Sequence, residues 1–431
     1  MVTVVKALIT KLPKLPPSSV PTASPGFPHK HPRPTAFNAT IEQPNDISCT
    51  LPLHNYITVC SFPMISKFTC LRTLRLAARH PCRSRSLATA ASNRAADFIR
   101  IVEVGPRDGL QNEKKSIPVE TKIELVERLA QTGLQTIEAG SFVSPKWVPQ
   151  MANSSEILQH ILSSPPKSET PITYQWLLPN VRGLDNFLSV WQAQSSSQNA
   201  YPTPPSSPSE NAADLDSTLP KTELSIFTAA TESFTQKNTN CSIAESLTRF
   251  EPIMSRAKDL NLPVRAYISV ALGCPYEGPN VDPHKVAELA ISLLEMGADE
   301  ISVADTTGMG TAPKTAELLK TLSAAGVEKN DLALHFHDTY GMALVNSVVA
   351  LEHGVRTFDA AVAGLGGCPF SPGATGNVAT EDLVHLVHSL GAKTGVDIER
   401  LAEVGEWISG EIGRPNESRA GKATLAQLRK R

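Results

Sequence analysis

Two short segments of the chain carry residue types that bind divalent metal ions. Arg107 and Asp108 stand in the first, and His335 and His337, separated by one residue, stand in the second. Residues two apart in a strand project from the same face, so both imidazoles are expected on one side. Together with Asp108 and the amide of Asn377, they form a set of nitrogen and oxygen ligands. Such a set suits an octahedral Mg²⁺ or Mn²⁺, and the ligand types alone do not exclude zinc.

The glycine-rich segment 364–370 reads Gly-Leu-Gly-Gly-Cys-Pro-Phe and contains Cys368. This composition predicts a flexible loop that closes over a substrate and excludes water. A thiol carried into a site in this way can act as a general acid or base. The alternative is a plain turn with a passive thiol. Phosphate binding is also conceivable, but the loop lacks the lysine and hydroxyl of a P-loop.

Three further charged residues are candidates for the chemistry. Arg107 stands between Pro106 and Gly109, which indicate a turn. A guanidinium there can stabilise a carbonyl oxygen that gains negative charge in a transition state. Glu138 and Asp305 stand at the ends of predicted strands and are candidates for proton transfer or support of the site. Their alternative role is a salt bridge at the mouth of a barrel.

Short β-rich runs alternate with longer segments of helical spacing from residue 98 onward. The strands are expected at 98–105, 136–141, 174–179, 223–229, 264–270, 300–305, 332–338 and 357–364. Such alternation implies parallel strands joined by helices, and eight units predict an α/β-class (β/α)₈ TIM barrel. An open doubly wound sheet is the alternative. Active sites of TIM barrels lie at the C-terminal ends of the strands, where the candidate residues stand.

The helices between the strands are marked by proline near the start and glycine at the end. The prolines stand at positions 118, 145, 283 and 313, and the clearest helices are expected at 119–131, 242–260, 283–296 and 313–325. An extra C-terminal helix at 398–412 is expected to pack outside the barrel. A tail at 413–431 follows it.

The barrel domain is expected to span residues 98–412, with one interruption. Segment 193–220 is rich in proline and serine and is interpreted as a disordered, low-complexity insertion. It follows a helix and precedes a strand, which places it on the face opposite the strand C-termini. The insertion is therefore expected to be neutral for catalysis.

Residues 1–95 are interpreted as a disordered leader. No acidic residue occurs between Asp46 and Asp97, whereas arginines recur among serine, alanine and leucine. This composition, with an amphipathic stretch at 65–78, is typical of a mitochondrial transit peptide at about 64–95. The matrix is the expected location, or the cytosol if the leader does not function. Because the segment begins near Met64, translation can also start there.

Composition excludes several other classes of function. The formal net charge is −2, so no bulk electrostatic attraction favours nucleic acid or a membrane surface. No apolar run reaches the length of about 18 residues that spans a bilayer. The seven cysteines are scattered without CxxC spacing, which argues against a disulfide framework or structural zinc.

The motifs around the candidate residues resemble those of the hydroxymethylglutaryl-CoA lyases. The matching segments are VEVGPRDGLQNEK at 102–114, SFVSPKWVPQM at 141–151, ALGCPYEG at 271–278, VAGLGGCPF at 362–370, GN at 376–377 and TEDLV at 380–384. The resemblance covers about 98–412 and implies a metallolyase TIM barrel, in the superfamily that also contains isopropylmalate and homocitrate synthases. It departs from the family at Ala139, Gly140 and Thr307, and the tail lacks the usual cysteine.

The resemblance also implies an activity and a role for each residue. The activity is retro-Claisen cleavage of 3-hydroxy-3-methylglutaryl-CoA to acetoacetate and acetyl-CoA, as in leucine degradation and ketone-body formation, by a homodimer that needs Mg²⁺ or Mn²⁺. By this resemblance the metal ligands are Asp108, His335, His337 and Asn377, and the catalytic thiol is that of Cys368. The resemblance also implies that Arg107 and Gln111 bind the substrate and that Glu138, Asp305 and His335 assist proton transfer. Gln111 and Glu381 are expected to support the site.

Two alternatives remain at this stage. A Claisen-type synthase of the same superfamily would condense acetyl-CoA with a 2-oxo acid, but such enzymes usually append a regulatory domain after the barrel. A catalytically inactive barrel that only binds a partner is the other alternative. Dependence of activity on added metal separates it from both enzymes.

Overall fold

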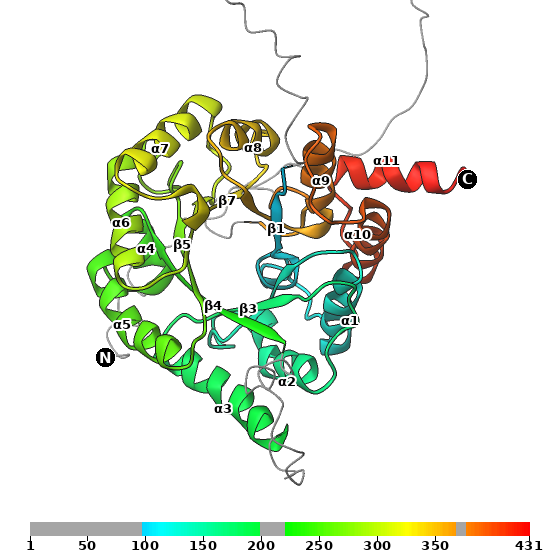
Figure 1. The fold of residues 1–431 in the computed structure, drawn as a ribbon, viewed down its shortest axis with the longest axis horizontal. Coiled ribbons are helices and arrows are strands. Elements are labelled where there is room, and N and C mark those ends of the chain that lie inside the picture. Colours follow the sequence, from blue (N-terminus) through cyan, green and yellow to red (C-terminus); the bar gives the residue numbers. More distant parts are fainter. Residues whose placement is uncertain (1–96, 199–219, 368–375) are drawn as a thin grey trace, which may run out of the picture. The chain divides into compact units, whose positions relative to one another are not determined.

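The computed structural model describes residues 97–198, 220–367 and 376–431, and Figure 1 shows its ribbon. Eight parallel strands follow one another around a closed barrel. They are β1 (Arg100–Glu103), β2 (Thr136–Ser141), β3 (Thr173–Leu177), β4 (Lys221–Ala229), β5 (Val264–Ser269), β6 (Glu300–Asp305), β7 (Leu332–Phe336) and β8 (Thr357–Ala360). Because β1 pairs with both β2 and β8, the TIM barrel is confirmed and the open sheet is wrong.

The helices form a ring around the strands (Figure 1). They are α1 (Val119–Ala130), α2 (Ser154–Ser163), α3 (Val181–Gln198), α4 (Glu232–Thr239), α5 (Ile243–Asp259), α6 (Pro283–Glu295), α7 (Ala312–Ala324), α8 (Ala343–Glu352), α9 (Thr380–Ser389), α10 (Ile398–Ile412) and α11 (Arg419–Leu428). Short helical turns also lie between these elements: η3 (Gly105–Gly109), η4 (Pro149–Met151), η5 (Lys329–Asp331) and η6 (Val362–Gly364). Among the residues described, no helix is long and apolar enough to cross a membrane.

Burial on both faces explains why the strands consist of near-continuous apolar runs. Every residue of β2, β6, β7 and β8 is buried, as expected for parallel strands with helices outside and packed side chains inside. The helices are amphipathic instead, and α1 buries Leu125, Val126 and Leu129 against the barrel. Local capping fixes some helix starts: Ser242 and Glu245 form a capping box at α5.

Several predicted boundaries need correction. The strands expected to run to 338 and 364 end earlier, at Phe336 and Ala360. The chain after β8 turns into η6, where Ala363 has a positive φ of 58° that a strand does not allow. Pro145 begins no helix, since 145–147 form a turn and α2 starts at Ser154.

Two domain boundaries also differ in detail. Residues 193–198 of the expected insertion are the last residues of α3, while 199–219 and the leader lie outside the described residues. The expected tail contains α11, capped by Ser418, which accepts a hydrogen bond from the Gly421 amide. Asp382 of α9 binds this start through Ser418 and the amide of Ala420. The contacts that stabilise α11 are thus distant in sequence, which is why local pattern did not reveal it.

Candidate metal centre and active site

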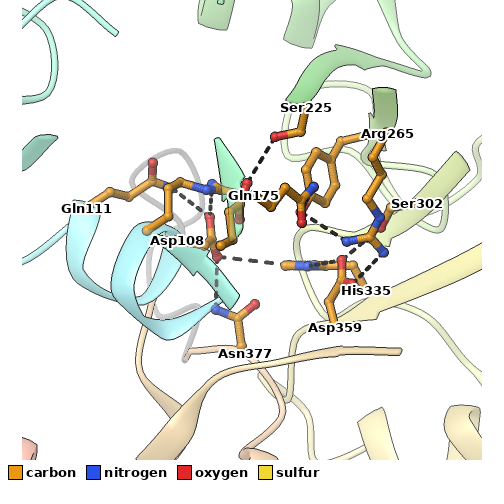
Figure 2. Close-up of polar contacts among 12 residues, drawn as sticks. Asp108, Gln111, Gln175, Ser225, Arg265, Ser302, His335, Asp359 and Asn377 are labelled. Carbon is orange, nitrogen blue, oxygen red and sulfur yellow. Dashed lines mark hydrogen bonds and ion pairs between the residues drawn. The ribbon is translucent and has the colours of Figure 1, made fainter. Parts of the chain in front are cut away.

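The candidate metal ligands meet at the C-terminal ends of β1 and β7, and Figure 2 shows Asp108, His335 and Asn377 among them. Asp108 lies in η3, the turn after β1, while His335 lies in β7 and His337 follows directly. One donor atom from each of these three buried residues lies within 4.8 Å of the others. Asn377 pairs with His337 in an isolated bridge, and its Nδ2 donates to Asp108 Oδ2 at 2.9 Å. The structure therefore brings together all four residues that the sequence put forward as ligands.

Two buried atoms of this cluster have no hydrogen-bond partner among the described residues. They are Nδ1 of His337 and Oδ1 of Asn377. Burial lowers the pKa of His337 to about 4, so its imidazole is neutral and keeps a lone pair. Burial opposes ionisation of Asp108, but the positive charge of Arg107 and the hydrogen bond from Asn377 outweigh it and lower its pKa. One carboxylate, neutral imidazole and a free amide oxygen fit a divalent cation.

Arg107 lies beside this cluster because the chain turns after β1. The five-residue π-helical turn η3, with Pro106 at its start, confirms the predicted turn and buries the arginine. Its Nη1 contacts Asp108 Oδ1 at 2.7 Å, and its Nη2 contacts Glu138 Oε2 at 2.7 Å. Gln111 also donates to Asp108 Oδ1, at 2.7 Å. Glu138 thus forms a salt bridge with Arg107, which is the alternative role considered for Glu138. Arg107 itself lies at the mouth of the barrel.

Glu138 and Asp305, the two carboxyl groups predicted to transfer protons, are both buried. Burial raises the pKa of Glu138, and Arg107 offsets this only partly. Burial also raises the pKa of Asp305 to about 6, against the effect of hydrogen bonds such as that from the Gly310 amide. In the described part of the chain, Oδ1 of Asp305 has no hydrogen-bond partner. Asp305 can therefore exchange a proton near neutral pH.

Glu381 lies at the start of α9 and contacts the backbone after β8. Both of its carboxylate oxygens accept from the amide of Ala363, at 3.1 and 3.0 Å. Burial raises its pKa to about 8. Glu381 thus holds η6, the turn that precedes the glycine-rich segment. Cys368 itself lies outside the described residues.

Three charged residues that contact the site or its supports lie within the strands and were not among the predicted site residues. Asp359 of β8 contacts His335 and also Arg265 of β5. Glu103 of β1 accepts hydrogen bonds from the amides of Gly105 and Val362 and from the hydroxyl of Thr380. Alternate residues of barrel strands point inward, so a charged residue in an apolar strand is a recognisable signal. The predicted site residues lie mainly at the strand ends.

Comparison with known proteins identifies the family to which the chain belongs. The profile of the HMGL-like family matches residues 98–408. The cytoplasmic 3-hydroxy-3-methylglutaryl-CoA lyase of Danio rerio is 46% identical over 327 residues, which are 76% of this chain and 87% of that protein. The chain belongs to the hydroxymethylglutaryl-CoA lyase family. The mitochondrial hydroxymethylglutaryl-CoA lyase of Rattus norvegicus is 44% identical over 340 residues, 79% of this chain and 94% of that protein.

Solved structures of the hydroxymethylglutaryl-CoA lyase family share this fold. The enzyme from Pseudomonas aeruginosa superposes with a TM-score of 0.66 at 44% identity, covering 77% of this chain and 99% of that chain. An HMG-CoA lyase from Acinetobacter baumannii, solved with coenzyme A and 3-methylmalate, has a TM-score of 0.65 at 31% identity. The match covers 77% of this chain and 97% of that chain.

Proposed function

We propose that the chain is a carbon–carbon lyase that cleaves 3-hydroxy-3-methylglutaryl-CoA to acetoacetate and acetyl-CoA with the help of Mg²⁺ or Mn²⁺. The observation that carries this proposal is the buried donor set of Asp108, His335, His337 and Asn377 beside the Arg107 guanidinium. Membership of the hydroxymethylglutaryl-CoA lyase family supports the choice of substrate. In a cell, this reaction would serve leucine degradation and ketone-body formation.

The reaction is a retro-Claisen cleavage with a simple balance of atoms. A base removes the proton of the C3 hydroxyl, and C3 becomes the carbonyl carbon of acetoacetate. The C2–C3 bond breaks, and its electron pair moves to C2 to give the enolate of acetyl-CoA. A proton delivered to C2 then completes acetyl-CoA. Asp108, His335, His337 and Asn377 would hold a divalent cation, which would supply Lewis-acid chemistry that lowers the pKa of the substrate hydroxyl.

Arg107 is suited to the thioester end of the substrate. Although burial opposes its charge, Glu138 and Asp108 raise the pKa of Arg107, which therefore remains a cation throughout. A fixed buried cation stabilises the oxygen that gains charge as the enolate forms. Holding Arg107 between two carboxylates fixes its direction before the substrate arrives.

The proton transfers are assigned to groups around this point. Glu138, Asp305 and His335 are the candidates for the base, and the raised pKa of Asp305, about 6, suits a group that exchanges protons near neutral pH. We assign delivery of the proton to C2 to the thiol of Cys368. Glu381 would act on this thiol indirectly, by holding the turn before its segment.

The relatives support part of what we propose for partners and location. A relative solved with coenzyme A supports an acyl-CoA substrate, and we propose a homodimer and no nucleic-acid or membrane partner. We also propose the mitochondrial matrix, since one relative is named mitochondrial, whereas another is named cytoplasmic. A fluorescent protein fused after residue 97 should enter mitochondria, also when the fusion starts at Met64. Diffuse cytosolic signal from both fusions would contradict this location.

The activity is tested with the full chain and 3-hydroxy-3-methylglutaryl-CoA. Equimolar acetoacetate and acetyl-CoA should appear with Mg²⁺ and not with EDTA. Cys368→Ala should lower kcat by about 10²–10⁴-fold, the usual contribution of a general acid or base. Cys241→Ala is the control, because Cys241 is a buried thiol in the connection between α4 and α5, where its sulfur contacts the Thr239 hydroxyl. A folded chain that binds Mn²⁺ but cleaves nothing would refute the proposal. Acetyl-CoA with 2-oxo acids would then be assayed to detect a synthase.

A further inference from the structure

The two nitrogens of His335 face different partners. Nδ1 lies 3.2 Å from Oδ2 of Asp359, and Nε2 lies 4.0 Å from Oδ2 of Asp108 in the metal cluster. Figure 2 shows the ring between these two carboxylates. Asp359 is fully buried, so its carboxylate has no access to solvent. The ring of His335 is therefore held, on the side opposite Asp108, by Asp359, which is not one of the proposed metal ligands.

Asp359 is bound in turn by donors from two other strands. Its Oδ1 accepts from Nη2 of Arg265 at 2.6 Å, and its Oδ2 accepts from the Ser302 hydroxyl at 2.8 Å. Arg265 is fully buried and also pairs with Glu300 at 2.7 Å. A buried carboxylate paired with a guanidinium stays ionised, and an ionised carboxylate only accepts hydrogen bonds. The contact with His335 therefore requires the imidazole proton to be on Nδ1.

We propose that Asp359 is a positioning residue for the metal centre, which keeps the proton of His335 on Nδ1 and so presents the lone pair of Nε2 to the ion. The inference deepens the proposed function and rests on it. Four successive strands supply the chain of contacts, with Arg265 on β5, Ser302 on β6, His335 on β7 and Asp359 on β8. The direction of one ligand is thereby fixed by the interior of the barrel.

The second histidine provides an internal contrast. Nδ1 of His337 is buried, and no hydrogen-bond partner for it exists among the described residues. The carboxylate thus fixes His335 and leaves His337 unaffected. Loss of a carboxylate behind a histidine ligand usually weakens metal binding by about 10–100-fold.

Asp359→Asn is the informative substitution. Arg265 can only donate, so it should take the amide oxygen of the new side chain and leave the amide NH₂ facing His335. That NH₂ would donate to Nδ1 and move the imidazole proton to Nε2. Ser302→Ala is the matched control, because it removes a neutral donor to the same oxygen but leaves the carboxylate in place.

The test uses the full metal-free chain and two readouts that need no substrate. ¹⁵N NMR of the histidine side chains, with His335→Gln for assignment, should show the wild-type proton of His335 on Nδ1. In Asp359→Asn it should move to Nε2, and the Kd for Mn²⁺ from electron paramagnetic resonance should rise about 10–100-fold. Ser302→Ala should retain the wild-type tautomer.

A wild-type His335 protonated on Nε2 would overturn the inference, even if the Asp359 variant did not fold. Unchanged Mn²⁺ affinity in a folded Asp359→Asn chain would overturn it as well. Failure of the proposed function gives a different result, namely no cleavage of the thioester substrate despite the expected tautomer and Mn²⁺ affinity.

Discussion

Two pairs of buried carboxyl groups behave in opposite ways. Burial would raise all four pKa values, but Arg107 lowers that of Asp108, while Arg265 and the hydrogen bond from His335 lower that of Asp359 to about 2. Glu103 and Glu381 accept only neutral donors in the described structure, and burial raises their pKa values to about 7 and 8. The type of donor, not the depth of burial, thus decides the charge of each group.

This difference matches what each pair does. Asp108 and Asp359 remain negative where a cation and its ligand must be held. Glu103 and Glu381 bind the backbone amides of Val362 and Ala363, where no charge is required. A cationic side chain beside a buried carboxyl group therefore keeps that group ionised, so that it can bind a metal ion or a histidine ligand. Without such a neighbour, the carboxyl group only binds the backbone.

Among changes to these carboxyl groups and their partners, the largest expected effect comes from removing the guanidinium of Arg107. Arg107→Met should lower kcat by about 10²–10³-fold, because one preorganised donor to the developing enolate is lost. It should also destabilise the fold by about 3–5 kcal/mol, because Asp108 and Glu138 lose their buried partner. Kinetics and urea unfolding measure both effects. Arg429→Met, which breaks an exposed pair, is the control, and a fully active Arg107→Met chain would contradict the role of this cation.

The carboxyl groups without a cationic partner should make stability depend on pH. Glu381 has an ordinary pKa of 4.5 and a folded value of about 8, so its stabilising effect is complete below pH 4.5 and is lost as pH rises through 8. At roughly 1.4 kcal/mol per pKa unit, the loss is about 4–5 kcal/mol. Glu381→Gln should remove this part of the slope in urea unfolding between pH 4.5 and 8. An identical slope in the variant would mean that Glu381 is ionised in the folded chain.

Bound metal should stabilise the folded chain through the proposed ligands and not through Glu381. Mn²⁺ at about 100 times its Kd should raise the free energy of unfolding by about 2.7 kcal/mol. His337→Gln should abolish this increment, whereas Glu381→Gln should keep it. Urea unfolding with and without Mn²⁺ gives the comparison, and an increment that survives in His337→Gln would place the ion elsewhere.

The smallest expected effect concerns the start of α11, which Asp382 of α9 binds. Asp382 accepts from the Ser418 hydroxyl at the start of α11. Ser418→Ala should cost about 1 kcal/mol, the usual value of a helix cap, and leave kcat unchanged. A marked loss of kcat would show that α11 influences the site, contrary to its position on the outside of the barrel (Figure 1).

The fold was largely predictable because strand and helix periods are local signals. The bounds of β2 and β6 were predicted as found, whereas β7 and β8 end early because the chain turns there to approach Asn377 and Glu381. The site was predictable where polar residues follow strands, as Asp108 and His337 do.

The rest depends on pairing across the barrel, which no local pattern encodes. Asp359 and Arg265 are 94 residues apart in sequence, and only the register of β5 through β8 brings them together. Glu103 similarly binds Thr380, which is 277 residues away. Charged residues inside strands therefore reveal that a buried partner exists but not which residue it is.

The central claim is that one divalent ion, held by Asp108, His335, His337 and Asn377, enables cleavage of the C2–C3 bond. Titration of the metal-free full chain with Mn²⁺, with acetoacetate release as the readout, tests this most directly. The rate should rise from zero in proportion to bound Mn²⁺ and level off at one ion per chain. A full rate without metal, or a rate that is independent of bound Mn²⁺, would contradict the claim.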